Sequence, residues 1–317
     1  MAAWLGLDLG GTNARAAVVE DSGRILASTR QPLADRAPEA VADVLAEAAR
    51  AALALSGNPA VQGCGAAVAG QLAGDNGVVA VGPNLGWRDV PLARLLSGRL
   101  QLPVRLVNDL RAAAWGELNG GAGRGARDIL VVFVGSGVGS CAIADGRIVT
   151  GASNVAGEFG HIKVAGPDGR PCGCGERGCL EAYVGGHNLS AQLREAVQSG
   201  PTALAALCAG ELDALHPGHL EQALGLADPA ASALFARAAQ MLSLAVANYV
   251  TVMNPARLVL GGGVLSNVPS LRAAVADGVQ RYTNGNARKT VQVVDAALGD
   301  DAGLVGAALL GQSSRNV

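Results

Sequence analysis

The chain carries two copies of one local pattern, and this repetition constrains its fold more than any other feature. Residues 4–25 and residues 129–148 each read as an apolar strand, a glycine-rich turn, a second strand, and a further turn that ends in Gly-Arg-Ile. Two interpretations stay open. The copies are two unrelated hairpins, because hairpins with glycine turns are common, or they are the starts of two duplicated domains, each supplying one phosphate-binding hairpin to a shared cleft.

Composition narrows the class of protein. Of the 317 residues 50% are hydrophobic, so a sizeable core can be buried, and the formal net charge is −2. This balance favours a small or anionic metabolite over a nucleic acid or a membrane as the partner. The longest apolar run, near 241–252, is too short to span a bilayer. No basic segment precedes the first apolar residues, so we expect a cytoplasmic protein with six reduced cysteines.

Periodicity and turn residues place the main elements. We expect strands at 61–69 and 104–107, and helices at 38–55, 230–253 and 301–310. Apolar strands alternate with helices along the chain, which is typical of an α/β protein.

A glycine-rich stretch divides the chain. Residues 119–125, Asn-Gly-Gly-Ala-Gly-Arg-Gly, are typical of a hinge or linker. We expect a small lobe of residues 1–118 with the C-terminal helix 300–317, and a large lobe of residues 119–299.

Three glycine-rich turns follow apolar strands, and together they favour a nucleotide site. Backbone N–H groups approach phosphate oxygens closely where side chains are absent, and a carboxylate at a strand end can hold Mg²⁺ or its waters. None of the turns is a Walker loop, because no Gly-Lys-Ser/Thr follows, and each one alone is more often a simple turn. The candidate nucleotide and magnesium residues are Asp8, Gly10, Gly11, Thr12, Asn13, Gly135, Ser136, Gly137, Gly139, Gly261, Gly262 and Gly263.

Three cysteines fall within eight residues, at Cys172, Cys174 and Cys179, and His161 lies eleven residues upstream of the first. Three thiolates and one imidazole complete a closed tetrahedral Zn²⁺ site, which would make the metal structural and not catalytic. The alternative is a set of unliganded surface thiols or a redox pair.

Asn108 and Asp109 end the strand expected at 104–107. An Asn-Asp pair in this place is either a helix N-cap or, at the edge of a cleft, a carboxylate that accepts a hydroxyl proton. The sequence alone leaves both readings open.

These motifs together resemble the ROK family (repressors, open reading frames and kinases), within the actin, hexokinase and Hsp70-like ATPase superfamily. The most specific segments are 157–161, Gly-Glu-Phe-Gly-His, and 172–181, Cys-Gly-Cys-Gly-Glu-Arg-Gly-Cys-Leu-Glu. Segments 8–15, 83–87 and 108–109 also fit in order and spacing. The resemblance covers essentially the whole chain.

The resemblance implies an α/β, two-lobed actin/hexokinase/Hsp70-like fold, a duplicated ribonuclease H-like architecture with a ligand cleft between the lobes. It implies Mg-ATP-dependent phosphorylation of a hexose 6-hydroxyl, with glucose as the expected hexose, and a homodimer or homotetramer. Asp109 would be the catalytic base, His161 would both ligate zinc and touch the sugar, and the zinc-binding loop would span 161–181. The implied substrate-binding residues are Asn84, Asn108, Asp109, Glu158, His161 and Glu181.

The chain departs from the family pattern in two places. Ser136 stands where many relatives have Thr, and its hydroxyl can serve in the same way. The stretch between His161 and Cys172 is one residue longer than expected, and we expect a bulge at 167–169 to absorb it.

Three other functions remain as alternatives. A sugar-responsive repressor would need a DNA-binding domain ahead of Asp8, where only seven residues stand, so we expect none. A kinase for N-acetylglucosamine, N-acetylmannosamine or another hexose differs by pocket shape, which one sequence does not reveal. A polyphosphate donor is disfavoured by the few lysines.

Overall fold

The computed structural model describes residues 2–74 and 76–312, and the chain divides into two compact units. Unit 1 comprises Met1–Arg127, Cys141–Ala156 and Ala296–Val317, and unit 2 comprises Asp128–Ser140 and Gly157–Asp295. The units differ from the expected lobes, because 119–127, 141–156 and 296–299 belong to unit 1. Residues 313–317 of the expected C-terminal segment lie outside the described residues.

The unit boundary lies beyond the glycine-rich stretch because Glu117 ties that stretch back to unit 1. The carboxylate of Glu117 is fully buried and accepts the N–H groups of Ala122, at 2.8 Å, and of Ala297 and Leu298, at 3.1 and 2.8 Å. The segment therefore packs on unit 1 and is not a free linker.

Unit 1 is built on a five-stranded sheet in the order β3-β2-β1-β4-β8. Neighbours β1/β2 and β2/β3 are antiparallel, whereas β1/β4 and β4/β8 are parallel. The strands are β1 Ala3–Leu9, β2 Asn13–Glu20, β3 Ile25–Pro32, β4 Val61–Val68 and β8 Val104–Asn108. The expected strands in this half are confirmed.

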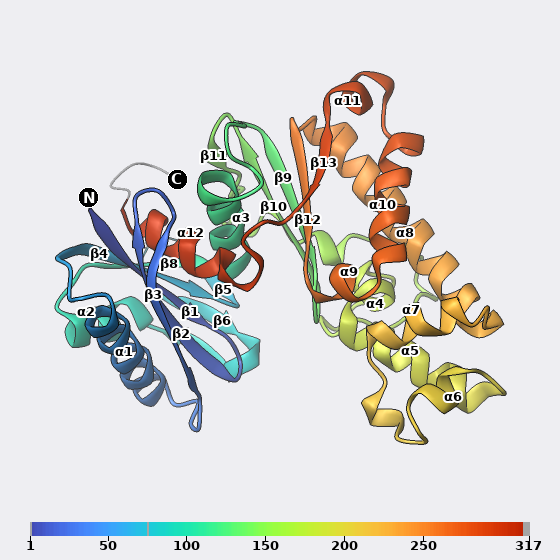
Figure 1. The fold of residues 1–317 in the computed structure, drawn as a ribbon, viewed down its shortest axis with the longest axis horizontal. Helices are drawn as coiled ribbons and strands as arrows, with labels where there is room; N and C mark the ends of the chain where they lie inside the picture. The colour runs from blue at the N-terminus through green and yellow to red at the C-terminus, as the bar shows by residue number, and fades with distance from the viewer. Residues whose placement is uncertain (1, 75, 313–317) are drawn as a thin grey trace. The chain divides into compact units, whose positions relative to one another are not determined.

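Alternation along β1 explains why both faces of this sheet are covered (Figure 1). Leu5, Leu7 and Leu9 point to one face, where they join the core beneath α1 (Pro38–Leu55). Trp4 points to the other face and packs with Leu304 of α12 (Ala302–Gly311). Each face thus buries one set of apolar side chains.

Glycines let α12 approach its neighbours unusually closely. A Cβ on Gly306 would lie 1.6 Å from the carbonyl oxygen of Ala112 in α3 (Asp109–Gly120), and a Cβ on Gly65 would lie 1.8 Å from that of Ala307. Only residues without a side chain allow this helix–helix and helix–strand contact. The close contact fixes α3 and α12 against the β1/β4 part of the sheet.

Shorter elements complete unit 1. A small sheet has the order β5-β6-β7, and η1 lies between β6 and β7. Their bounds, with the second helix of this unit, are β5 Gln71–Leu72, β6 Val79–Gly82, η1 Pro83–Leu85, β7 Trp87–Val90, α2 Leu92–Leu100 and η4 Gly299–Asp301.

The second sheet repeats the strand order of the first, in the order β11-β10-β9-β12-β13. As in the first sheet, the outer hairpin β10/β11 is antiparallel, whereas β9/β12 and β12/β13 are parallel. The strands are β9 Ile129–Val134, β10 Val138–Ala144, β11 Arg147–Ile148, β12 Arg257–Gly261 and β13 Gln292–Asp295, with β11 and the end of β10 assigned to unit 1. Two unrelated hairpins would not share this topology, so the duplication is confirmed.

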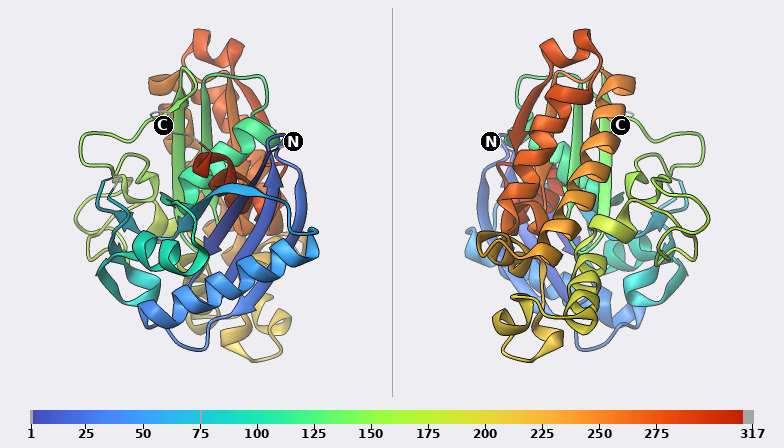
Figure 2. Two further views of the ribbon diagram at one scale, coloured as in Figure 1. Left: turned by 90° about the vertical axis from the view of Figure 1, so that its left-hand side faces the viewer. Right: turned by 90° about the vertical axis from the view of Figure 1, so that its right-hand side faces the viewer.

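Helices make up most of the rest of unit 2, and the longest of them is α8, Pro229–Met253 (Figure 2). It packs on α10, where a Cβ on Gly278 would lie 2.3 Å from the Cβ of Ser243. The remaining helices are η2 Phe159–His161, α4 Glu181–Val184, α5 Gly186–Ser199, α6 Leu204–Leu207, η3 Leu212–Ala214, α7 Pro217–Gly225, α9 Gly263–Asn267, α10 Pro269–Tyr282 and α11 Gly285–Thr290.

By length and composition α8 could also cross a membrane, the one such helix among the described residues. Its side chains Leu242, Val246 and Val250 are completely buried within the unit. We therefore interpret α8 as a core helix.

Candidate active site

The first glycine turn closes the β1/β2 hairpin of unit 1. The N–H of Gly10 donates to the carbonyl of Asn13 at 3.0 Å, and the side chain of Asn13 donates to the hydroxyl of Thr12 at 2.9 Å. A Cβ on Gly11 would lie 3.3 Å from the Cβ of Asn84, which stands exposed in η1. The structure thus brings one predicted nucleotide turn beside one predicted sugar residue.

Asp8 lies one residue before the end of β1, next to a cluster that the sequence did not reveal. Its carboxylate is 3.8 Å from the guanidinium of Arg15, which also pairs with Asp301 and donates to the carbonyl of Asp300 at 2.6 Å. Burial raises the pKa of Asp8 above its ordinary value, and the charges of Arg15 and Arg30 partly oppose this rise. A carboxylate oxygen is a ligand type that a hard cation such as Mg²⁺ prefers.

The sequence analysis did not identify Asp300 and Asp301, because their sequence signal is weak. Asp300 and Asp301 stand at the start of the last helix, followed by a glycine, Gly303, whose Cβ would lie 3.8 Å from the carboxyl carbon of Asp8. Acidic residues at a helix start are common, so nothing local connects them with a strand almost 300 residues earlier.

Asn108 is the N-cap of α3. Its side-chain oxygen accepts the N–H groups of Leu110 and Arg111 at 3.1 and 3.2 Å, and its amide donates to the carbonyl of Gly70 at 3.2 Å. Of the two readings of the Asn-Asp pair, the cap therefore holds for Asn108, and its predicted contact with a sugar stays a prediction.

Asp109 is the first residue of α3, and its carboxylate accepts the N–H of Leu110 at 2.9 Å. The N–H groups at a helix N-terminus attract a carboxylate. The hydrogen bond to its neighbour also restricts the orientation of the side chain. A carboxylate held in this way suits the orientation of a hydroxyl group.

The second glycine turn, in unit 2, is held by the start of α5 and by Glu181. The N–H groups of Gly186 and His187 donate to the carbonyls of Gly135 and Ser136 at 2.8 and 3.1 Å. The carboxylate of Glu181 accepts the N–H of Val138 at 2.8 Å. The turn is therefore rigidly placed.

A Cβ on Gly137 would lie 2.4 Å from a carboxylate oxygen of Glu181, so a side chain there would displace this carboxylate from the turn. Gly139 lies just beyond the turn, within β10. Glu181 was predicted to bind a sugar hydroxyl, and the structure gives its carboxylate this further role at the turn.

The third glycine segment meets the strand that leads into the second turn. Gly261 ends β12 opposite Phe133 of β9, and Gly262 has a φ of 95°. A Cβ on Gly262 would lie 2.5 Å from the carbonyl oxygen of Val134, next to Gly135, and Gly263 begins α9. The two predicted glycine segments of unit 2 are thus brought together.

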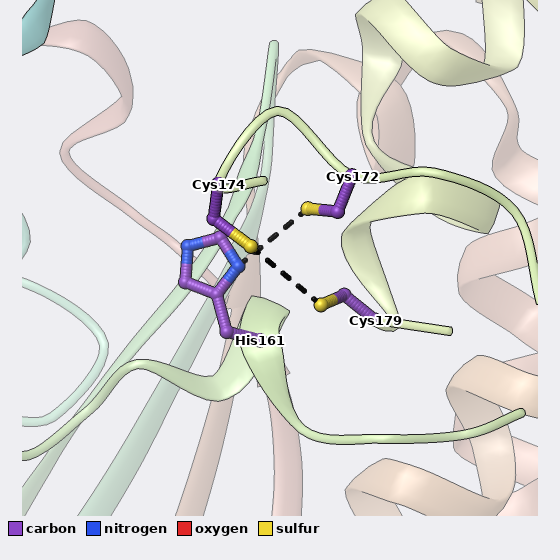
Figure 3. A group of neighbouring side chains, drawn as sticks. All are labelled: His161, Cys172, Cys174 and Cys179. Carbon is purple, nitrogen blue, oxygen red and sulfur yellow. Dashed lines mark hydrogen bonds between the residues drawn. The ribbon is translucent and has the colours of Figure 1, made fainter. Parts of the chain in front are cut away.

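The four predicted metal ligands converge in unit 2 (Figure 3). Nδ1 of His161 and Sγ of Cys172, Cys174 and Cys179 all lie within 4.8 Å of one another. The Cys174–Cys179 sulfurs are 3.8 Å apart, and the Cys172 sulfur is 3.7 Å from Nδ1. A tetrahedral Zn²⁺ requires about 3.8 Å between sulfurs and about 3.6 Å between sulfur and nitrogen, so the donors fit this ion.

A bound cation would change the protonation of these thiols. Burial raises the pKa of the Cys172 thiol to about 12. A bound cation reverses this preference, because a coordinating thiol is deprotonated. Three thiolates and a dication together carry one net negative charge.

Lys163 lies beside the cysteine cluster, and sequence reasoning missed it. Its ammonium lies 3.2 Å from the sulfur of Cys179 and 3.7 Å from the carboxylate of Glu176, and it donates to the carbonyl of Arg177 at 3.0 Å. The hydrogen bond to Cys179 raises the pKa of Lys163. Lys163 stands two residues after His161, a predicted ligand, and this position is the sequence signal that could have identified it.

Residues predicted to bind a sugar lie on both sides of the cluster. Nε2 of His161, on the opposite side of the ring from the sulfurs, is 3.8 Å from the carboxylate of Glu158. On its other side the cluster reaches Glu181, whose carboxylate is 4.0 Å from the sulfur of Cys172. One side chain, Glu181, therefore lies beside both the cysteine cluster and the second glycine turn.

The expected bulge is present and leaves the ligand set intact. The chain turns at 166–169, where the N–H of Gly169 donates to the carbonyl of Gly166 at 2.8 Å. Residues on either side are paired as Lys163 with Cys179 and Pro171 with Arg177. This turn lies before Cys172, and the four predicted ligand atoms still converge.

Comparisons with known proteins agree with this arrangement. The ROK family model matches residues 4–314. A glucokinase of Streptomyces coelicolor is 33% identical over 96% of both chains, and an N-acetylmannosamine kinase of Escherichia fergusonii is 30% identical over 98% of this chain and 99% of its own. The crystal structure of a ROK family glucokinase from Streptomyces griseus, in complex with glucose and AMPPNP, matches with a TM-score of 0.81 and 34% identity, over 98% of this chain and 99% of that one. The chain therefore belongs to the ROK family and has its two-lobed, actin/hexokinase-like fold.

Proposed function

We propose that the protein transfers the terminal phosphoryl group of ATP to the 6-hydroxyl of a hexose, and that the hexose is glucose. One observation carries this proposal. Glu158 and His161 lie side by side in unit 2, and Glu181, beside the same cysteine cluster, binds the second glycine turn. The similarity to the Streptomyces griseus glucokinase, solved with glucose and AMPPNP, supports both the sugar and the donor.

Asp109 is the proposed catalytic base. It orients the sugar 6-hydroxyl and accepts its proton while the phosphoryl group moves. The transition state of phosphoryl transfer is loose, so positioning matters more than the strength of the base. A carboxylate fixed by the N–H of its neighbour at a helix N-terminus meets that requirement.

The remaining residues bind and orient. Asn84, Asn108, Glu158, His161 and Glu181 are the proposed hydroxyl partners. Backbone N–H groups of the three glycine segments would hold the phosphates, and Asp8 would hold Mg²⁺. When bound, Mg²⁺ would neutralise the charge that develops on the phosphates.

We propose that the His161, Cys172, Cys174 and Cys179 cluster holds a structural Zn²⁺. The spacing of the four donors supports this ion, and a closed set of four ligands leaves no position for a reacting water. The role of the cluster would be to fix the loop so that Glu158 and His161 keep their orientation. The cluster would take no part in the chemical step.

A coupled kinase assay across a panel of hexoses with Mg-ATP tests the proposal. The similarity to an N-acetylmannosamine kinase makes an N-acetylhexosamine the second candidate substrate. We expect kcat/KM to be highest for glucose. Higher values for an N-acetylhexosamine would reassign the substrate, and failure with every sugar would leave a sensing role. A parallel arm with polyphosphate tests the donor.

We also propose that the protein is cytoplasmic, binds neither nucleic acid nor membranes, and forms a homodimer or homotetramer. Unit 2 exposes apolar side chains around one hollow of about 340 Å³, with Ile162 and Val252 at 38% and 78% exposure. Light scattering after gel filtration tests the assembly. A monomer at micromolar concentration would contradict it.

A further inference from the structure

Arg111 is a buried cation in the first turn of α3, two residues after Asp109. Only 8% of its surface is exposed, and its backbone N–H is bound by the cap residue Asn108 at 3.2 Å. A cation is unfavourable at a helix N-terminus, and a buried charge is costly unless hydrogen bonds compensate it. The hydrogen-bond partners of this side chain are therefore needed to stabilise its buried charge.

Four hydrogen bonds of this side chain reach one short loop that precedes the Gly-Glu-Phe-Gly-His segment. The guanidinium binds the side-chain oxygen of Asn154 and donates to the backbone carbonyls of Asn154, Ala156 and Thr150 at 3.0, 3.4 and 3.5 Å. Arg111 and residues 150–156 all belong to unit 1. One side chain from the helix of the proposed base thus holds three residues of the loop.

The loop has three residues with positive φ, and the one that is not a glycine, Asn154, needs such support. Gly151, Asn154 and Gly157 have φ angles of 72°, 59° and 105°. A Cβ on Gly157 would lie 2.5 Å from the carbonyl oxygen of Ser140. Left-handed conformations at non-glycine residues persist only where the surroundings determine them. Gly157 is followed directly by Glu158, so the path of the loop sets where Glu158 begins.

We infer that Arg111 is a positioning residue for the hexose. By fixing residues 150–156, it fixes the backbone from which Glu158 extends toward a sugar hydroxyl. This inference rests on the proposed function, because it uses Glu158 as a hydroxyl partner. The planar fork of arginine reaches several oxygens at once, which an ammonium group cannot do.

The test is a kinetic comparison of Arg111→Met and Arg111→Lys with the wild type, with Arg94→Met as the control for the loss of one arginine. Arg94 is exposed on α2, in the same unit. We expect Arg111→Met to lower kcat/KM for the hexose about 10- to 100-fold, chiefly through KM, because small displacements of a binding group are costly. KM for ATP should stay within about twofold, and Arg111→Lys should recover part of the loss.

Hydrogen exchange of the peptide 150–158 supplies a readout independent of turnover. We expect faster exchange there in both Arg111 variants than in the wild type and in Arg94→Met. Unchanged exchange, an unchanged KM for the hexose, or equal increases in both KM values would overturn the inference. A wild-type protein inactive on every hexose would overturn the proposed function as well, whereas an active wild type with unaffected variants would overturn only this inference.

Discussion

Replacing Cys174 by serine tests whether the cysteine cluster stabilises the fold. Serine removes one of four donors from a site whose sulfurs are 3.8 Å apart, and a hydroxyl is a poor substitute for a thiolate. Backbone bonds still hold the loop, among them Cys172 N–H to Glu176 at 2.8 Å and Gly178 N–H to Arg170 at 3.0 Å. We therefore expect a folded but less stable protein.

The size of the effect follows from binding linkage. A cation present at about 1,000 times its Kd stabilises the folded state by about 4 kcal/mol. For a domain of about 150–250 residues, each kcal/mol shifts Tm by about 2–4 °C. We expect the wild type to hold about one zinc ion per chain, and we expect Cys174→Ser to lose it and to lower Tm by about 10 °C. KM for the hexose should rise, because His161 is a ligand of the same cluster.

Thermal denaturation with and without a chelator, together with metal analysis, measures these quantities. The chelator should bring the wild type to the Tm of Cys174→Ser and leave the variant unchanged. Cys208→Ala is the matched control, because Cys208 is buried in the same unit and outside the cluster. It should keep its zinc. Active, purified protein without zinc would refute the reasoning.

Two further changes test the charges beside the predicted metals. Lys163→Met removes the ammonium next to Cys179. Because residues that bind metal ligands typically raise metal affinity, we expect the variant to release zinc to a competing chelator about 10- to 100-fold more readily. Release at the wild-type rate would argue against this role of Lys163. For Asp8, burial raises the pKa in the folded state, so ionisation of Asp8 costs stability as the pH rises through that range. Asp8→Asn should lose kinase activity. Without Mg²⁺, its Tm at neutral pH should match or exceed that of the wild type, and this difference in Tm should vanish toward pH 4. A lower Tm at neutral pH would contradict the burial argument.

Features set by neighbouring residues could be predicted from the sequence. The hairpins followed from glycine turns between apolar strands, and α1 began and ended where Pro38 and the apolar spacing placed it. The convergence of Cys172, Cys174 and Cys179 could be predicted because metal coordination imposes a spacing within one loop. The duplication followed from two copies of one local pattern and was confirmed by two sheets of matching order.

Features that join distant segments could not be predicted. Arg15 meets Asp301 across almost the whole chain, and Arg111 reaches a loop about forty residues away. The unit boundary differs from the expected one because the buried carboxylate of Glu117 holds the glycine-rich stretch that was expected to be a linker. Each of these side chains is of a type that usually lies on the surface, and only the fold shows which one is buried.

The activity of Asp109→Asn on glucose with Mg-ATP tests the central claim most directly. Asparagine keeps an oxygen that can accept the N–H of Leu110, now at 2.9 Å from the carboxylate, so the variant should fold with an unchanged Tm. A general base contributes about 10²–10⁴-fold. We predict a loss of kcat of at least about 100-fold in Asp109→Asn, whereas a kcat near that of the wild type would contradict the assignment of Asp109 as the base.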